Sequence, residues 1–169
     1  MATQTVFHTL DPIYGPESHT LILGTMPSPR SRACGFYYAH PQNRFWRALS
    51  AVYGEAVPPD TAAQQAFILA HGLALWDVLA RCDIGGASDA SIRNPVPNDI
   101  AWLAAAAPIR RIFTTGAAAT RLYRRLCEPR VGLPCTMLPS PSAANCRLSL
   151  DSLTAAYGAL REAAAPPCV

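Results

Sequence analysis

Short apolar runs alternate along this chain with longer segments in which apolar residues recur at helical spacing. The apolar runs end at a glycine or a polar turn and predict strands over residues 20–24, 72–79, 109–116 and from 134 onward. The segments between them predict helices over residues 43–53, 61–72, 98–107, 117–127 and 149–164. Strands that alternate with helices favour an α/β fold, with three layers (α/β/α) around a central four-stranded, mainly parallel sheet.

One long segment, residues 81–99, is rich in glycine, serine, aspartate, asparagine and proline and predicts a loop. Long loops in compact domains are usually functional or mobile. In a parallel α/β sheet, binding sites gather beyond the carboxyl ends of the strands. The candidate site therefore lies in the segments that follow the predicted strands: residues 24–28, the loop after residue 79, the turn at Gly116 and the loop that ends at Asn145.

The length and the apolar pattern bound the organisation of the chain. Its 169 residues suffice for one domain, and we expect a single domain over residues 1–169, with its core at about 18–163 and a frayed tail at 165–169. No run of 18 apolar residues and no signal-peptide pattern occurs. We therefore expect a cytoplasmic protein.

Charge and cysteine usage exclude several chemistries. The net charge is only +3, and all 14 basic side chains are arginine. Because no lysine is present, a mechanism that needs a lysine Schiff base is excluded. The six cysteines form no C-x-x-C pair and no close grouping with histidine, so we expect no zinc site, no iron–sulfur cluster and no cofactor.

The richest local chemistry lies in residues 37–46, which read YYAHPQNRFW. Polar side chains such as His40 and Asn43 would each need a partner if they were buried, so this mixture with aromatic rings suits a binding site. Phe45 and Trp46 also fit a role in the core at the start of a helix. Asn43 fits either a site residue or the cap of that helix.

Two other segments form stiff turns after predicted strands. In residues 24–28, GTMPS, Gly24 allows a close backbone approach and Pro27 fixes the exit of the chain. This is not a phosphate-binding P-loop, because it lacks the glycine spacing and the lysine. Residues 139–142, PSPS, present two hydroxyls between prolines, which suits either a phosphodiester contact or a plain turn.

These motifs, GTMPS, AHPQNRFW and LPSPSAAN, stand in this order beyond predicted strands and resemble those of the uracil-DNA glycosylase superfamily. The more specific resemblance is to its hypoxanthine-DNA glycosylase (DNA-deoxyinosine glycosylase) branch, with which the chain shares tandem tyrosines before His-Pro, the strand LWDVL and an Ile-x-Asn…Pro-Asn-Asp loop. The resemblance covers residues 20–150. It implies a monofunctional DNA glycosylase of base excision repair that acts on deaminated bases, hypoxanthine above all. The resemblance also implies that the protein binds DNA, acts as a monomer and is associated with the nucleoid.

One position departs from the family pattern. The mismatch-specific branch carries a catalytic asparagine in the first motif, where this chain has Met26, and a thioether cannot orient water by strong hydrogen bonds. The hypoxanthine branch uses an asparagine in the middle motif, and the resemblance carries the catalytic role onto Asn43. The same resemblance makes Tyr38 the ring that stacks on the extruded base.

The remaining site residues are likewise implied by the resemblance. Gly24, Thr25, Met26 and His40 would surround the base, although His40 fits a role in bracing its loop equally well. Asp77, Asn94, Asn98 and Asp99 are secondary candidates for holding the base, with loop structure and helix capping as the alternative. DNA contacts would come from Pro27, Ser28, Ser140, Pro141, Ser142, Ala143, Ala144 and Asn145.

Three other functions remain open from the sequence. The first is a mismatch-specific uracil-DNA glycosylase, which differs only in base preference. The second is an inactive single-strand-binding module, in which the aromatic rings stack on bases and Met26 marks lost catalysis. The third is an enzyme for free nucleosides, which would not need a phosphate contact at Ser140 and Ser142.

Overall fold

The centre of the fold is a parallel sheet of four strands in the order β3-β2-β6-β7. A computed structural model describes residues 2–164, with only the backbone at 162–164, so the predicted frayed tail lies outside the described residues. The strands confirm the predicted sheet. Their bounds are Thr20–Gly24 for β2, Leu73–Asp77 for β3, Arg111–Thr115 for β6 and Cys135–Leu138 for β7.

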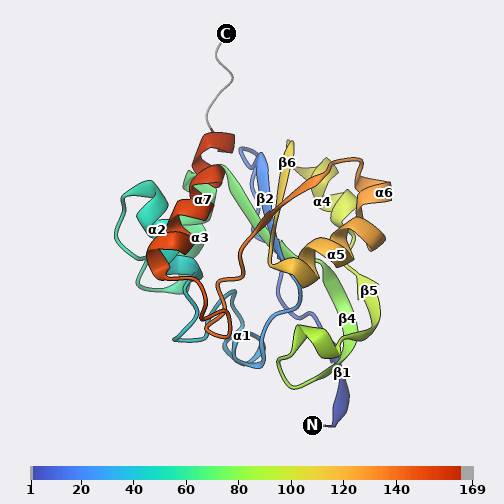
Figure 1. Ribbon diagram of the computed structural model, residues 1–169. Coiled ribbons are helices and arrows are strands. Elements are labelled where there is room, and N and C mark those ends of the chain that lie inside the picture. The colour runs from blue at the N-terminus through green and yellow to red at the C-terminus, as the bar shows by residue number, and fades with distance from the viewer. Residues whose placement is uncertain (1, 165–169) are drawn as a thin grey trace.

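Helices cover both faces of this sheet and give the three predicted layers (Figure 1). Side chains of β2 alternate between the two layers, so Ile22 joins one core cluster while Leu21 and Leu23 join the other. One face carries α2 (Phe45–Tyr53), α3 (Thr61–Ala70) and α7 (Leu150–Ala164). The other face carries α4 (Ile100–Ala106), α5 (Ala117–Leu126) and α6 (Glu128–Val131).

A second, antiparallel sheet of three strands has the order β1-β4-β5, with bounds Thr3–Phe7, Leu79–Gly85 and Arg93–Pro97. β4 follows β3 after the single residue Val78. The predicted loop over residues 81–99 is therefore wrong: β4 and β5 pair in it, joined by a turn that holds the short helix η1 (Asp89–Ser91). These strands could not be recognised in the sequence, because they contain polar residues and prolines. An antiparallel ribbon with an exposed face needs no continuous apolar run.

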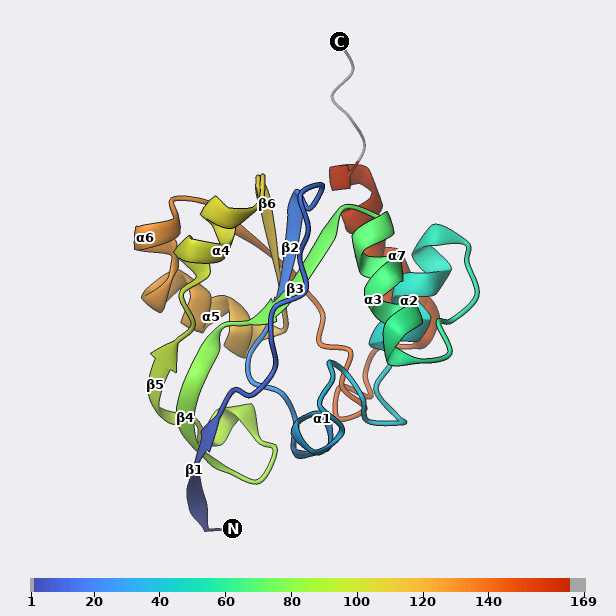
Figure 2. The ribbon, with the colours of Figure 1, turned by 180° about the vertical axis from the view of Figure 1, so that it is seen from behind.

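The antiparallel sheet also extends the core toward earlier residues than predicted. Figure 2 shows β1 alongside β4. The sequence placed the start of the core near residue 18, but Val6, Leu10 and Ile13 are buried. Val6 lies opposite Cys82 in the β1–β4 ladder. The segment before residue 18 therefore belongs to the core of the fold, and it brings His8 to the carboxyl end of β3.

Helix ends follow local capping chemistry. The carboxylate of Asp99 accepts a hydrogen bond from the Trp102 N–H at 3.0 Å, which confirms one of two predicted caps for α4. The short helix α1 (Pro29–Cys34) was not predicted; it begins after Ser28, whose hydroxyl oxygen accepts from the Ser31 N–H at 3.1 Å. Among the described residues no helix is long and apolar enough to cross a membrane.

Candidate active site

A cleft of about 680 Å³ opens at the edge where the parallel strands end. This is the edge at which the sequence predicts the site. The lining comes from the first loop (residues 24–28), the aromatic segment (residues 37–46), Asp77 at the end of β3 and the second loop (residues 139–145). The structure therefore brings the second loop, which lies far along the chain, together with the first loop and the aromatic segment.

Gly24 and Asp77 form the floor of the cleft and lie opposite each other in the β2–β3 ladder. A Cβ atom on Gly24 would lie 2.4 Å from Oδ1 of Asp77 and 3.3 Å from the Tyr38 hydroxyl oxygen. Any side chain at position 24 would therefore collide with the carboxylate, which explains why glycine ends this strand. Only 5% of the Asp77 surface is exposed.

His8 holds the second oxygen of that carboxylate. Its Nε2 lies 2.8 Å from Oδ2 of Asp77, and the side chains are 3% and 7% exposed. The Leu10 N–H donates to the other ring nitrogen, Nδ1, at 3.3 Å. Nδ1 is thus the acceptor and Nε2 carries the proton that is donated to Asp77.

Tyr38 forms one wall of the cleft. Its ring stacks on Phe45, with 3.9 Å between the ring centroids and 12° between the planes. Its backbone has a φ of 52°, a left-handed conformation that is uncommon for residues other than glycine. Burial raises the pKa of the Tyr38 hydroxyl, and the nearby Asp77 carboxylate raises it further, so the hydroxyl stays protonated near neutral pH. Its oxygen lies 3.3 Å from the hydroxyl oxygen of Thr115.

Asn43 lines the cleft and also supports α2. Its Oδ1 accepts a hydrogen bond from the Phe45 N–H at 2.9 Å, close to the start of the helix. Asn43 therefore lies at the site. It is not the N-cap of α2, because that position is Arg44 and Asn43 stands one residue before it. Met26, from the first loop, borders the cleft as well, and it also packs against the core cluster that contains Leu21 and Leu23.

The second loop is stabilised by its own hydrogen bonds and by Arg44. Ser140 Oγ accepts from the Ser142 N–H at 3.3 Å, and the amide of Asn145 donates to the Ser140 carbonyl oxygen at 3.0 Å. The Arg44 guanidinium donates to main-chain oxygens of Asn145 at 2.9 Å, Ser142 at 3.3 Å and Leu148. Arg44, which the sequence did not single out, thus ties the aromatic segment to the second loop.

Five predicted site residues do not line the cleft: His40, Asn94, Asn98, Asp99, which caps α4, and Ala143. His40 is exposed, and its Nδ1 accepts from the Gln42 N–H at 3.1 Å, which fits loop bracing. Asn94 donates to Asp83 at 2.7 Å on the antiparallel sheet. Asn98 donates to the carbonyl oxygens of Asp77 and Leu79 and so supports the backbone beneath the site.

The structure adds residues that sequence reasoning missed. His8 follows β1, which was not predicted, and its contact with Asp77 spans 69 positions. Asp89 belongs to the exposed η1 turn, but it also borders the cleft. Desolvation raises the pKa of its carboxyl, and the hydrogen bond to the Thr25 hydroxyl offsets only part of this increase. No sequence signal marks either residue. Within the part of the chain that the structure describes, no group of three or more potential metal ligands occurs.

The family of this chain follows from comparison with known proteins. The family model "Uracil DNA glycosylase superfamily" matches residues 12–161, which includes the first loop, the aromatic segment and the second loop. The chain belongs to this superfamily. Membership confirms the resemblance drawn from the motifs and identifies the chain as a DNA glycosylase. It also explains why the cleft lies beyond the carboxyl ends of the parallel strands.

Two relatives of this superfamily member come from species of Methanosarcina. A hypoxanthine DNA glycosylase of Methanosarcina acetivorans is 32% identical over 130 residues, 76% of this chain and 82% of the relative. One from Methanosarcina barkeri is 29% identical over 142 residues, covering 83% and 89%. A solution NMR structure of a candidate uracil DNA glycosylase from M. acetivorans superposes with a TM-score of 0.78 at 27% identity, covering 94% of this chain and 98% of that one. The α/β/α fold predicted from the sequence is thus confirmed.

Proposed function

We propose that this DNA glycosylase releases hypoxanthine from deoxyinosine in DNA and leaves an abasic site. The observation that carries the proposal is the cleft itself, in which Tyr38 and Asn43 of the aromatic segment meet the carboxylate of Asp77 at the end of β3. The names of two relatives that match more than three quarters of the chain support hypoxanthine as the base.

The residues of the cleft suit the steps of base release. An extruded base stacks on the free face of Tyr38, since Phe45 covers the other face. The Asn43 amide orients the attacking water, whose oxygen bonds to C1′ while the bond from C1′ to the base nitrogen breaks. The bonding electrons leave with the base, and the proton lost by the water ends on it. Hydrogen-bond donors near the base stabilise the departing charge.

The hydroxyls at the mouth of the cleft suit a DNA substrate. Ser28, Ser140 and Ser142 lie at its rim with Asn145, and they come from two loops that flank the site. Backbone phosphates fix the register of a protein on DNA through contacts of this type. We therefore propose these residues as the phosphate contacts, in a protein that acts as a monomer and is associated with the nucleoid.

The absence of lysine from the sequence defines the reaction product. A glycosylase that cuts the strand does so through an imine. No lysine side chain is available to form one, which leaves the N-terminal amine as the other amine that could. We therefore expect a monofunctional enzyme: the strand stays intact at the abasic site until alkali breaks it. Borohydride should trap no covalent complex between the protein and the DNA.

The test uses labelled duplexes that each carry one hypoxanthine, uracil or xanthine, with and without hot alkali after incubation. Breakage of the hypoxanthine strand only after alkali supports the proposal. Faster release of uracil than of hypoxanthine would make the protein a uracil glycosylase instead. Binding without release from any duplex would favour the single-strand-binding module.

Free nucleosides are the remaining alternative substrate. The double variant Ser140→Ala and Ser142→Ala separates the two classes, because only a DNA substrate needs the phosphate contacts. We expect a loss of at least about 10-fold in kcat/KM on the duplex, since each hydrogen bond to a charged phosphate is worth about 1.5–3 kcal/mol. Unchanged activity on both deoxyinosine and the duplex would support the nucleoside enzyme.

A further inference from the structure

The solvent-facing side of α5 carries three arginines, Arg121, Arg124 and Arg125, which we call the arginine stripe. All three are exposed, whereas Leu122 and Tyr123 on the other side of the helix are buried in the core. Residues three and four positions apart lie on one face of a helix, so the three guanidinium groups gather on the same side. The helix therefore presents to solvent a positive charge that the core does not require.

No carboxylate forms an ion pair with the arginine stripe within the part of the chain that the structure describes. The ion pairs found there join His8 to Asp77 and His71 to Glu55. Like charges three or four positions apart destabilise a helix, because they repel one another. The stripe therefore weakens α5 in the free protein, and a polyanion that binds to it would relieve the repulsion.

The arginine stripe begins at the cleft. Ala117, Arg121 and Arg125 are spaced four residues apart and so form one row along α5, and Ala117 at its head is exposed and lines the cleft. Desolvation raises the pKa of the Asp89 carboxyl on the cleft border, and the Thr25 hydroxyl and the positive charge of Arg121 lower it. Arg121 therefore lies close enough to the cleft to act on a charge at its border.

The length of this row fits the DNA that flanks an extruded nucleotide. At about 1.5 Å per residue, Arg121 lies about 6 Å and Arg125 about 12 Å along the helix axis from Ala117. Successive phosphates of one strand are about 3.4 Å apart along a duplex, so the row covers about the second to the fourth phosphate from the cleft. Since α5 covers the face of the sheet opposite α2 and α7, the stripe extends the cleft on one side only (Figure 1).

We propose that the arginine stripe of α5 binds the phosphate backbone of the duplex on one side of the extruded nucleotide. This inference rests on the proposed function, in which the cleft takes a nucleotide out of DNA, and it extends the DNA-binding surface beyond the serines at the rim. The planar fork of arginine suits phosphate oxygens. Such contacts carry no sequence information, so the stripe contributes equally to the binding of undamaged and damaged DNA.

The first experiment compares two double variants that change the net charge equally. Arg121→Gln with Arg125→Gln removes the row that begins at the cleft. Arg110→Gln with Arg111→Gln is the control, because these exposed arginines lie at the amino end of β6, away from the cleft. Affinity for an undamaged duplex is measured over a series of salt concentrations.

The slope of log affinity against log salt concentration reports the number of phosphate contacts. Each contact contributes about 0.9 to this slope, so the variant of Arg121 and Arg125 should lower it by about 1–2, and the control should leave it unchanged. Equal slopes in the two variants would overturn the inference and leave the stripe as a solvated face of the helix.

Stability and a lysine variant separate DNA binding from a structural role. Because repulsion along α5 is relieved, the glutamine variant of Arg121 and Arg125 should unfold at a denaturant concentration at least as high as the unaltered protein. Arg121→Lys with Arg125→Lys keeps both charges and should keep most of the salt slope. A lysine variant that loses as much slope as the glutamine variant would assign the effect to packing and overturn the inference.

Neutral phosphates then locate the contact. Hypoxanthine duplexes carry methylphosphonates at the second to fourth phosphates, on one side of the base or on the other. With the unaltered protein, neutralising the side that the stripe contacts should lower kcat/KM about 10-fold or more, and the glutamine variant of Arg121 and Arg125 should not respond to this change. A variant that responds to both sides as the unaltered protein does would overturn the inference. If the unaltered protein releases no hypoxanthine, the proposed function fails, whereas the salt slope on undamaged DNA still tests the stripe.

Discussion

The guanidinium of Arg44 donates a hydrogen bond to the main-chain oxygen of Asn145, 2.9 Å away and 101 positions further along the chain. The same group reaches the carbonyl oxygens of Ser142 and Leu148, and the Arg44 N–H donates to the Pro141 oxygen at 3.0 Å. Arg44 directly follows Asn43, the proposed catalytic residue. The wall that would contact phosphates is thus fixed to the segment that would perform the chemistry.

Replacing Arg44 by lysine should disrupt both segments while keeping the charge. A lysine has one ammonium group and cannot reproduce the planar fork that binds three carbonyl oxygens. We expect a loss of about 1–3 kcal/mol in the free energy of unfolding, because buried carbonyl groups lose their donors, and a loss of at least about 10-fold in kcat/KM on the hypoxanthine duplex. Arg47→Lys on the exposed side of α2 is the matched control. Equal behaviour of the two variants would contradict the interpretation.

Two variants separate the roles of Asn43. Asn43→Ala removes both the amide that orients water and the acceptor for the Phe45 N–H, whereas Asn43→Ser keeps an acceptor. We expect both to lower kcat by about 100- to 1,000-fold, as loss of a positioned amide does elsewhere, and only Asn43→Ala to lose about 1 kcal/mol of stability. Single-turnover kinetics and chemical denaturation measure the two effects. Turnover close to normal in Asn43→Ser would leave Asn43 with only a structural role, as the acceptor for the Phe45 N–H.

The Tyr38 ring should contribute through stacking rather than through its hydroxyl. Tyr38→Phe keeps the ring on Phe45 and should stay within a few-fold of normal kcat/KM. Tyr38→Ala should lose about 10- to 100-fold, since stacking on a base is worth about 1–3 kcal/mol. Tyr38→Gly should show the same loss of activity with higher stability than Tyr38→Ala, because glycine tolerates the φ of 52° at this position. A larger loss in Tyr38→Phe than in Tyr38→Ala would refute this interpretation.

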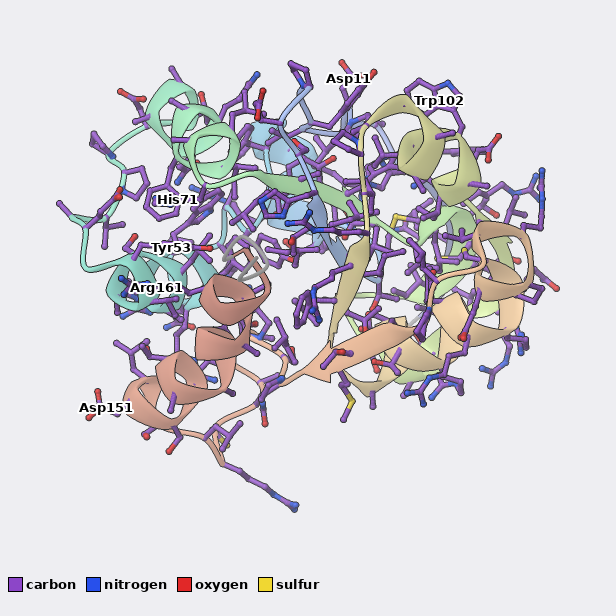
Figure 3. All side chains as sticks on the ribbon, turned by 90° about the horizontal axis from the view of Figure 1, so that it is seen from above. Asp11, Tyr53, His71, Trp102, Asp151 and Arg161 are labelled. Carbon is purple, nitrogen blue, oxygen red and sulfur yellow. The ribbon has the colours of Figure 1, made fainter. Side chains whose placement is uncertain are left out.

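A stability prediction concerns Tyr53, which lies beside His71 and Arg161 at a distance from the cleft (Figure 3). Its hydroxyl is buried without a hydrogen-bond partner among the described residues, and burial raises its pKa to about 12. Below pH 10 the hydroxyl is protonated in both states. Between about pH 10 and 12 the unfolded chain loses this proton while the folded protein keeps it, so stability falls as the pH rises.

Tyr53→Phe should therefore match or exceed normal stability near pH 7 and lose less of it between about pH 10 and 12. Tyr157→Phe is the contrast, because that hydroxyl donates to the Pro139 oxygen at 2.9 Å and its removal leaves a carbonyl group without its donor. It should cost about 1–3 kcal/mol near pH 7. Chemical denaturation at a series of pH values measures both variants. A Tyr53→Phe protein less stable than normal at pH 7 would show that the hydroxyl has a partner.

The sequence predicted those parts of the fold that depend on local pattern. β2 and its parallel neighbours read as apolar runs because both of their faces are covered, and α4 could be recognised from the carboxylate of Asp99 at its start. β4 and β5 could not be read in this way. Their stability comes from pairing across the ribbon, and Pro95 and Pro97 argue against a strand when taken alone.

For the site too, the sequence predicted what local motifs encode and missed what depends on distant contacts. Motifs and their order predicted the first loop, Tyr38, Asn43 and the second loop, all of which line the cleft. His40 and Asn94 were drawn from the same motifs and lie outside it, because a motif does not tell which side chains turn inward. His8 and Arg44 were missed. Their roles depend on contacts with residues 69 and 101 positions away, which no local pattern encodes.

The pairing of β1 with β4 has a consequence for how the protein matures. Thr3 faces Gly85 and Phe7 faces Arg81, so the earliest strand to be synthesised finds its partner only after β2, α1, α2, α3 and β3 have been made. Contacts this distant in sequence form slowly. A nascent chain on the ribosome that already presents the first loop still lacks the complete floor of the cleft. The second loop (residues 139–145) is made later still, so competence for base release is expected only after both the ribbon and this loop are in place.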